Sequence, residues 1–395
     1  MQVYRRTLAL PGVRSLMVLV FLARIPASAA GMIITLYVAV DLGRGYGAAG
    51  LVGAVATIGI GLGAPLLGRV VDRFGLRPML VITTIGETVF WVFASHLPFP
   101  VLLAAAFVGG MLVLPAMAIG RQAIPALVPP DLRRTAFSMD SVSAELSFMV
   151  GPAAAVLVTT QFSSRTAMIC MAGGLVLVGS LLWIVNPAMR SEAEKADDAT
   201  PVPRREWLTP RMIGVLAIGA GAVFILAGTE VAIVAQLRAN DELTWTGLVV
   251  MVWAAGSAVG GLVYGSLKRS IRQVTLMAWL GLLTIPIGLA GGQWWLLMLA
   301  LLPAAALCAP TVTATGEEVT RLAPTSARGE AVGLQSSAFT LGAAAGAPLV
   351  GFVVDHAGPG WGFALAGVGG VLVAGAAAMA ARSSRQPVKD PAEVS

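Results

Sequence analysis

Long apolar segments dominate this sequence and restrict its fold more than any other feature. A helix that crosses a bilayer needs about 20 mostly apolar residues, and the 395-residue chain contains a series of such runs. Only 12% of its residues are charged, against about 25% in soluble domains. We therefore exclude a soluble or disordered chain. We expect an all-α integral membrane protein with twelve transmembrane helices, at approximately residues 15–40, 48–68, 79–95, 100–120, 136–160, 166–186, 212–236, 245–267, 273–292, 295–317, 331–354 and 362–381.

One charged and proline-rich segment, residues 187–211, follows the sixth apolar run. It is the only plausible linker in the sequence. We therefore expect an N-terminal six-helix bundle over residues 1–186, a cytoplasmic linker over 187–211, and a C-terminal six-helix bundle over 212–395 that ends in a short cytoplasmic tail.

Positive charges fall mostly on alternate connecting segments. If the N-terminus is inside the cell, the outer segments carry only Arg44, Arg165 and Arg238 of the 26 Lys and Arg residues, and most of the others are inside. Cytoplasmic loops are enriched in Lys and Arg, so both termini are expected to be cytoplasmic. The same distribution accounts for the net charge of +6 without a nucleic-acid partner. The expected location is the plasma membrane (the inner membrane of a bacterial cell), with multiple spans.

The sequence also contains an internal repeat. Residues 50–68 align with 247–265, and residues 115–151 align with 310–346. Parallel duplication of a six-span unit, with a binding site near the midplane between the copies, is a transporter architecture. We therefore expect the two bundles to be pseudo-symmetric.

A motif rich in glycine and charge follows the second apolar run. It reads GRVVDRFGLRP over residues 68–78 and contains Gly68, Asp72, Arg73, Gly75 and Arg77. A glycine on a helix surface allows a neighbouring helix to approach closely, and a carboxylate one turn later can meet a helix N-terminus. A solvated turn that obeys the positive-inside rule would account for the arginines, but not for the single aspartate and the two glycines.

This motif resembles the loop signature of the major facilitator superfamily (MFS) between spans two and three, in sequence and in position. The resemblance, which points to bacterial efflux-type members, covers essentially the whole chain and implies the MFS fold and transport by alternating access. In the family the aspartate is held to lock the two halves in the outward-facing state, near the eleventh span. The five motif residues are therefore expected to form a conformational latch. The second-half copy keeps Gly265 but has Arg269 in place of the aspartate, so the latch is expected to be asymmetric.

Ionisable side chains within the spans are functional candidates, because a charge at mid-depth costs about 2.5–3.5 kcal/mol on insertion scales. Arg24 in span one and Glu145 in span five lie at similar depths. We expect an Arg24–Glu145 pair that neutralises both charges and opens to bind an anionic or polar substrate. The alternative is a structural ion pair that only fixes helix packing. The resemblance places span one along the central cavity, which favours a substrate role for Arg24.

Other acidic residues in the spans are assigned different roles. Glu230 in span seven is a candidate proton-coupling site, since a lone carboxylate in an apolar wall can carry a proton; alternatively it is a satisfied group near the outer mouth. Glu87 lies in span three, which is peripheral in the family, so a structural hydrogen bond is favoured over coupling. Asp140, Glu317 and Glu318 are interpreted as parts of a cytoplasmic gate or as compensation for nearby arginines.

Glycine and proline mark spans five and eleven. Gly151 and Pro152, with Gly346 and Pro348 in the second half, are candidate packing and hinge residues. Small residues would let helices of opposite halves slide closely, and proline bends a helix. Exporting families carry a Gly-rich GP motif here, although glycine and proline are common in membrane helices generally.

Drug/proton antiporters usually carry an arginine early in span four. The corresponding residue here is Ala105 or Ala106. This departure weakens the case for proton antiport.

We expect a secondary transporter and not an enzyme, because the sequence shows no metal-ligand cluster, phosphate-binding loop or nucleophile–base pair. The leading hypothesis is proton-coupled efflux of a small molecule by antiport. The alternatives are uptake or facilitated passage of a polar or anionic metabolite, and a non-transporting membrane receptor or assembly factor. The expected partners are a small-molecule substrate, protons and the lipid bilayer, with no cofactor and no metal, and the protein is expected to be a monomer.

Overall fold

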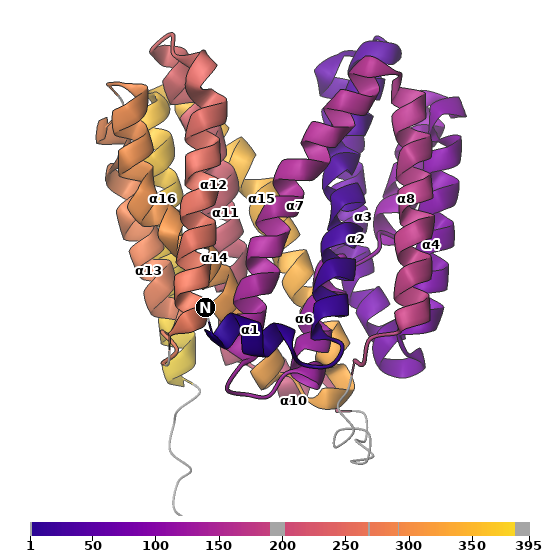
Figure 1. Cartoon of the computed structure of the whole chain (residues 1–395). Helices are drawn as coiled ribbons and strands as arrows, with labels where there is room; N and C mark the ends of the chain where they lie inside the picture. Colours follow the sequence, from indigo (N-terminus) through magenta and orange to yellow (C-terminus); the bar gives the residue numbers. More distant parts are fainter. Residues whose placement is uncertain (1, 190–201, 268, 291, 384–395) are drawn as a thin grey trace, which may run out of the picture.

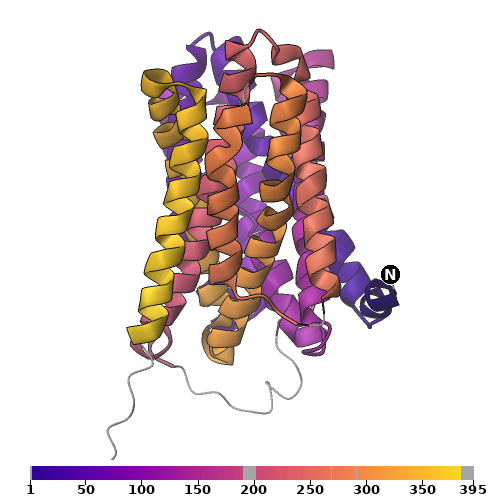
Figure 2. The same cartoon turned by 90° about the vertical axis from the view of Figure 1, so that its left-hand side faces the viewer.

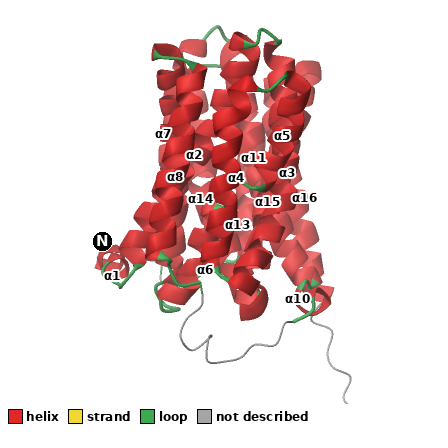
Figure 3. Cartoon of the chain, turned by 90° about the vertical axis from the view of Figure 1, so that its right-hand side faces the viewer, coloured by secondary structure: helices red, strands yellow, loops and turns green. Residues whose placement is uncertain are grey.

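The computed structural model describes residues 2–189 and 202–383, apart from residues 268 and 291. All regular secondary structure in these ranges is helical (Figures 1 and 3). Within them, 12 helical segments are long and apolar enough to cross a membrane, which confirms the predicted number. Each segment overlaps one predicted apolar run.

The spans are formed by the following elements. The first six are α2 (Val13–Leu36) with η1 (Tyr37–Asp41), α3 (Gly45–Phe74), α4 (Leu76–Phe93) with η2 (Ala94–His96), α5 (Phe99–Met111) with α6 (Ala116–Leu127), α7 (Arg133–Gln161) and α8 (Ser164–Val185). The second six are α11 (Pro210–Ala239), α12 (Thr246–Ser266), α13 (Gln273–Thr284) with η4 (Ile285–Ala290), α14 (Trp294–Leu322), α15 (Arg328–Ala357) and α16 (Pro359–Ser383). Two short helices, α1 (Gln2–Leu8) and α10 (Arg204–Trp207), precede the two sets.

Helices α2–α8 and helices α11–α16 are here called the first half and the second half. Two apolar cores consist of residues of the first half, with leucine, methionine and alanine side chains between its helices. A third core consists of residues of the second half. Residues 190–201 of the predicted linker (187–211) and the predicted tail beyond residue 383 lie outside the described residues.

The two halves meet at one end of the molecule. In Figure 1 their ribbons come together beside α1 and α10 and diverge toward the opposite end. Figure 2 shows α1 projecting sideways from the end where the halves meet. Hydrogen bonds between described residues of the two halves join α3 to α15 and α7 to α12. We call this end the closed end and the opposite end the open end.

Span four is interrupted between α5 and α6. Pro115 lacks an N–H group and disfavours helical geometry at the residue before it, so the N–H of Leu114 has no acceptor within a helix. Glu87 of α4 provides one, because the Leu114 N–H donates to Glu87 Oε2 at 2.8 Å. Glu87 is buried. The carboxylate therefore makes a structural hydrogen bond, as the sequence analysis favoured.

Gly75 connects α3 directly to α4. Its φ of 85° lies in a region that glycine enters at little steric cost. This glycine of the motif therefore serves the turn between two spans.

The glycines of spans five and eleven pack within their own halves. A Cβ atom on Gly151 would collide with Ser28 Oγ of α2, and one on Gly346 would come within 2.5 Å of the Phe224 carbonyl oxygen of α11. The expectation that they allow sliding between opposite halves is therefore wrong, because their faces point toward neighbours in the same half. Pro152 and Pro348 lie inside α7 and α15.

Candidate functional site

Asp72 joins the two halves at the α3–α15 seam, where the end of α3 meets the start of α15. The backbone N–H groups of Gly329 and Glu330 donate to Asp72 Oδ1 and Oδ2, each at 2.9 Å. The first N–H groups of a helix have no acceptor inside it, and the helix dipole also favours a negative charge there. Gln122 of α6 donates from Nε2 to Asp72 Oδ1 at 3.2 Å. Asp72 therefore contacts the eleventh span (α15), as expected.

Two glycines allow the backbones to touch at this seam. A Cβ on Gly68 would collide with the carbonyl oxygen of Gly329, and a Cβ on Gly329 would lie 2.6 Å from the carbonyl oxygen of Gly68. Deeper along the same pair of helices, Ser337 Oγ donates to the carbonyl of Gly61 at 2.6 Å. The absence of side chains at positions 68 and 329 therefore brings the start of α15 within reach of Asp72.

Glu330 adds ion pairs to the same seam. Its Oε1 lies 2.9 Å from Arg69 Nη2 in the first half, and it also pairs with Arg204 of α10. Arg69 was not included in the predicted latch. Arg69 follows Gly68 directly and precedes Asp72 by three residues. This spacing in a helix could have indicated that it lies on the same side of α3.

The two arginines expected in the latch lie elsewhere. Arg73 stands over the ring of its neighbour Phe74, at 5.2 Å. Arg77 stands over the ring of Trp183 in α8, at 4.7 Å, and its Nε donates to the Trp183 carbonyl at 3.3 Å. These contacts remain in the first half, because Arg77 follows the turn at Gly75. The expected role of both arginines in joining the halves is therefore not supported by their contacts, and Arg69 makes the crossing ion pair.

A second seam joins the start of α7 to the end of α12. Thr135 Oγ1 donates to the Gly265 carbonyl at 2.6 Å, and Ser138 Oγ donates to the Gly261 carbonyl. Arg134 Nη1 donates to the Leu267 carbonyl at 2.7 Å. Gly265 is the repeat counterpart of Gly68, but hydroxyl groups replace the carboxylate here. The two seams are thus asymmetric in their chemistry.

Three buried charged side chains form a cluster in the first half near the closed end. Arg24 of α2 donates from Nη2 to Asp140 Oδ1 at 2.6 Å and from Nη1 to the Asp140 carbonyl at 2.9 Å. Arg121 of α6 lies on the other side, with its Nε 3.7 Å from Asp140 Oδ2. The three side chains are between 2% and 6% exposed. We call this group the Arg24–Asp140–Arg121 cluster.

The cluster corrects the expected Arg24–Glu145 pair. Asp140 and Glu145 are five residues apart on α7, which at 3.6 residues per turn places them about 140° apart around the helix axis. Asp140 faces α2, whereas Glu145 faces α12. Position along a span gives the depth of a residue in the membrane but not its direction around the helix axis. Depth alone therefore paired Arg24 with the wrong carboxylate.

Glu145 instead bonds across the halves. Ser257 Oγ of α12 donates to Glu145 Oε1 at 2.5 Å. The same Ser257 Oγ accepts the N–H of Ala309 in α14 at 3.2 Å, directly before Pro310. Ser257 therefore links a carboxylate of the first half to two helices of the second.

Glu230 of α11 is exposed and lies close enough to Glu145 for their charges to interact. Since Glu145 belongs to the other half, Glu230 is on the side of α11 that faces the space between the halves. Cys308 of α14 is also within electrostatic range of Glu145. Sequence reasoning named both carboxylates but not their proximity.

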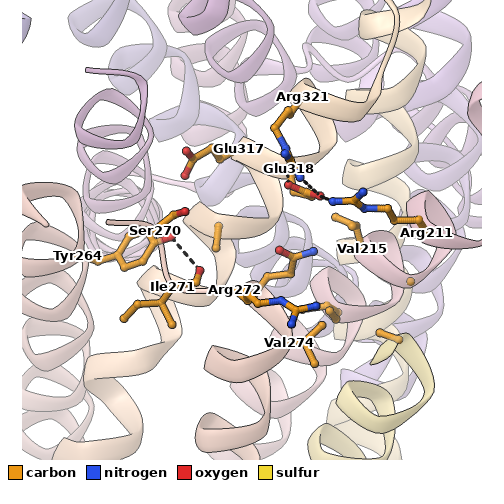
Figure 4. A pocket seen from close by; sticks show the side chains of 15 residues that line it. Arg211, Val215, Tyr264, Ser270, Ile271, Arg272, Val274, Glu317, Glu318 and Arg321 are labelled. Carbon is orange, nitrogen blue, oxygen red and sulfur yellow. Dashed lines mark hydrogen bonds and ion pairs between the residues drawn. The ribbon is translucent and has the colours of Figure 1, made fainter. Parts of the chain in front are cut away.

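A separate cavity of about 310 Å³ lies inside the second half near the closed end (Figure 4). Glu318, in its wall, binds Arg211 at 2.8 Å and Arg321 at 2.6 Å. Glu317 points to a different side of α14 in Figure 4 and lies 3.6 Å from Arg134 of the first half. Both acidic residues therefore neutralise nearby arginines, as the sequence analysis interpreted them. No cluster of three or more potential metal ligands occurs within the residues described.

A comparison with known families matches the Major Facilitator Superfamily over residues 16–291 and 239–394. The chain belongs to the Major Facilitator Superfamily. Members of this family are transporters, so this multi-pass membrane protein moves a small molecule across a bilayer. No curated protein matches the sequence.

Solved MFS structures share this fold at low sequence identity. The human organic anion transporter MFSD10 (TETRAN) has a TM-score of 0.71 and 18% identity, over 93% of this chain and 100% of that one. The proton:xylose symporter XylE, bound to 6-bromo-6-deoxy-D-glucose, has a TM-score of 0.71 and 16% identity, over 92% and 94%. A bacterial homologue of the iron transporter ferroportin, in an outward-facing state, has a TM-score of 0.75 and 14% identity, over 94% and 99%. At these identities the likeness concerns the fold.

Proposed function

We propose that this MFS protein exports a small molecule in exchange for protons, and that its closed end faces the cytoplasm. The distribution of arginines supports this orientation, because the connecting segments at the closed end carry most of them. Closure at the cytoplasmic end corresponds to an outward-facing conformation. The likeness to the ferroportin homologue in its outward-facing state is consistent with that assignment.

The observation that carries the proton coupling is the hydrogen bond that Glu145 makes across the halves, with Glu230 within electrostatic range of Glu145. These carboxylates belong to opposite halves, and one of them is hydrogen-bonded across the α7–α12 contact. Any motion that separates α7 from α12 must break the Glu145–Ser257 bond. Proton binding at this pair is therefore tied to the change between conformations, which antiport requires.

Transport by purified protein in proteoliposomes tests this proposal. A panel of amphipathic dyes and antibiotics is supplied with a proton gradient imposed in each direction. We expect flux that follows the gradient, and loss of this dependence in Glu230→Gln and Glu145→Gln. Asp355→Asn, which changes an exposed carboxylate on α15, is the matched control. Gradient-independent flux in the unmodified protein, or an unchanged gradient response in both glutamate variants, would refute proton coupling through this pair.

Uptake or facilitated passage of a polar or anionic metabolite is the second candidate function. The positive Arg24–Asp140–Arg121 cluster favours it. The cargoes named for the three structural neighbours are an organic anion, xylose and iron, and they do not select among substrates. Flux of organic anions without a requirement for a proton gradient would support this alternative. Absence of all transport by verified, folded protein would instead favour a non-transporting receptor or assembly factor.

A further inference from the structure

The Arg24–Asp140–Arg121 cluster contains two guanidinium groups and one carboxylate. Arg24 uses Asp140 Oδ1 and the Asp140 carbonyl, both within hydrogen-bond distance. Arg121 contacts Asp140 only at 3.7 Å, beyond the usual range of about 2.7–3.2 Å for an N–H···O bond. One positive charge therefore remains uncompensated within the cluster.

Two of the three guanidinium nitrogens of Arg121 also lack hydrogen-bond partners. Its Nε and Nη1 atoms are buried without a hydrogen-bond partner among the described residues, and the same is true of Arg24 Nε. Buried donors without acceptors are destabilising, by about 1–3 kcal/mol for neutral groups and more for charged ones. A negatively charged group that accepts hydrogen bonds from these nitrogen atoms would supply both the missing acceptors and the missing counter-charge.

Arg121 reaches the boundary between the halves. Its guanidinium carbon lies 5.0 Å from the ring centre of Phe339 in α15. Gly316 of α14 leaves room beside it, since a Cβ there would lie 3.5 Å from Arg121 Nη1. Next to Asp140, Ser141 Oγ and Thr313 Oγ1 are 2.9 Å apart across the same boundary. Second-half groups therefore cover Arg121 while the closed end is closed, and opening that end would expose its guanidinium.

We propose that Arg121 and Arg24 form a binding subsite for the carboxylate of an organic anion, covered by Phe339 and Gly316 in the present conformation and exposed when the closed end opens. A planar guanidinium matches a carboxylate in a two-point contact, which an ammonium group does not reproduce. The inference rests on the alternating access in the proposed function, but not on proton coupling or on the direction of transport.

Benzoate is a suitable probe, and benzamide is its neutral counterpart. Spin labels at positions 74 and 269, exposed at the closed ends of the first and second halves, report the opening of that end in full-length protein in lipid nanodiscs. Cys170 is exposed and is first replaced by Ser. A ligand shifts a conformational equilibrium toward the state that it binds better. Benzoate should therefore increase the population with the longer distance severalfold, while benzamide and an equal concentration of chloride should not.

Variants test the residues in this response. Arg121→Gln should abolish the benzoate effect, Arg121→Lys should retain only part of it, and Arg165→Gln, a charge change at the open end, should leave it intact. Phe339→Ala keeps all three charges and removes the covering ring, so it should lower the benzoate concentration needed for half the effect. This variant tests the subsite even if Arg121→Gln fails to fold. Equal effects of benzoate and benzamide, or an unchanged benzoate response in Arg121→Gln or Phe339→Ala, would overturn the proposal.

The proteoliposome assay separates this proposal from the proposed function. A benzoate response without gradient-driven flux would remove proton coupling and leave the subsite. Gradient-driven flux without a benzoate response would remove the subsite and leave proton coupling.

Discussion

At the scale of single residues, Asp72 accepts two backbone N–H groups of α15 and the side-chain amide of Gln122. Its two carboxylate oxygens fit adjacent N–H groups at a helix start, where an anion is favoured. An asparagine offers one acceptor oxygen and turns two N–H donors toward groups that are themselves donors. The charge and the second oxygen thus determine the strength of this contact.

Asp72→Asn should shift the protein toward the conformation with its closed end open. Loss of a charge-assisted hydrogen bond worth about 1.5–3 kcal/mol corresponds to a shift in the ratio of states of roughly tenfold or more. Distance measurements across the closed end, together with transport rates, test this. Expression should remain normal, and Asp131→Asn, at an exposed loop position of the same end, should behave like the unmodified protein. An unshifted distance and a normal rate in Asp72→Asn would show that the contact is not a latch.

Within the buried cluster, Asp140→Asn should destabilise the protein more than Arg24→Gln. The first change leaves two buried arginines without a counter-charge, while the second leaves Asp140 paired with Arg121. Breaking a buried ion pair costs about 3–5 kcal/mol. Thermal unfolding of the single and double variants measures this, and the double variant should lose less than the sum of the two singles. The losses of stability in Arg24→Gln and Glu145→Gln should add in the double variant. A non-additive loss would indicate that Arg24 and Glu145 interact directly.

Sequence reasoning identified Arg24, Glu145, Glu230 and Glu87 from charge inside apolar runs, and the hydrogen bond of Glu87 was anticipated correctly. The partners of Arg24 and Glu145 were not found, because all-apolar spans give little periodicity from which to derive helix rotation. Arg121 was missed as a buried group for the same reason. It lies just beyond the end of the predicted span 100–120, where the sequence gives no sign of burial, whereas α6 packs against both α2 and α15.

At the scale of helices, close approach between α3 and α15 depends on the missing side chains of Gly68 and Gly329. Gly68→Ala should force α3 and α15 apart and increase the open population of the closed end. Gly53→Ala lies on the same helix, with nothing within 4 Å of its added Cβ, and controls for helix propensity. Cross-linking between cysteines introduced at the end of α3 and the start of α15 measures the separation. If both variants cross-link as efficiently as the unmodified protein, close backbone contact at position 68 is not required for closure.

The interruption of span four gives a prediction about Glu87. Glu87→Gln retains an oxygen that accepts the Leu114 N–H, so stability and transport should change little. Glu87→Leu leaves that N–H buried without a partner, which costs about 1–3 kcal/mol. Thermal unfolding distinguishes the two. Loss of gradient-driven transport in Glu87→Gln with normal stability would indicate coupling instead of structure.

The number and order of the spans could be predicted because length and apolarity alone decide which segments cross a bilayer. The approach of Asp72 to α15 was expected from one motif and its family resemblance, whereas Gly75, expected in the latch, forms the turn between α3 and α4. The partners of Gly151 and Gly346 could not be predicted, because a small residue shows that a neighbour is close without showing which neighbour it is.

At the scale of the whole molecule, the two seams and two short helices act on the same end. Arg204 of α10 pairs with Glu330 beside the α3–α15 seam, and the Tyr4 hydroxyl of α1 donates to the Leu262 carbonyl of α12. Each short helix directly precedes the first span of one half. Opening the closed end must disrupt four kinds of contact between the halves: carboxylate to helix N-terminus, hydroxyl to carbonyl, the Arg69–Glu330 ion pair, and the stacking of Arg121 on Phe339.

Alternating access requires the two ends of the molecule to open in turn, and paired distance measurements at both ends test this. Labels at positions 74 and 269 report the closed end, and labels at positions 162 and 289, exposed at the open end, report the other. Under conditions of active transport, we predict that the closed-end distance increases as the open-end distance decreases, with the balance shifted by Asp72→Asn. Transport that proceeds while both distances stay fixed, or while both ends open together, would exclude alternating access.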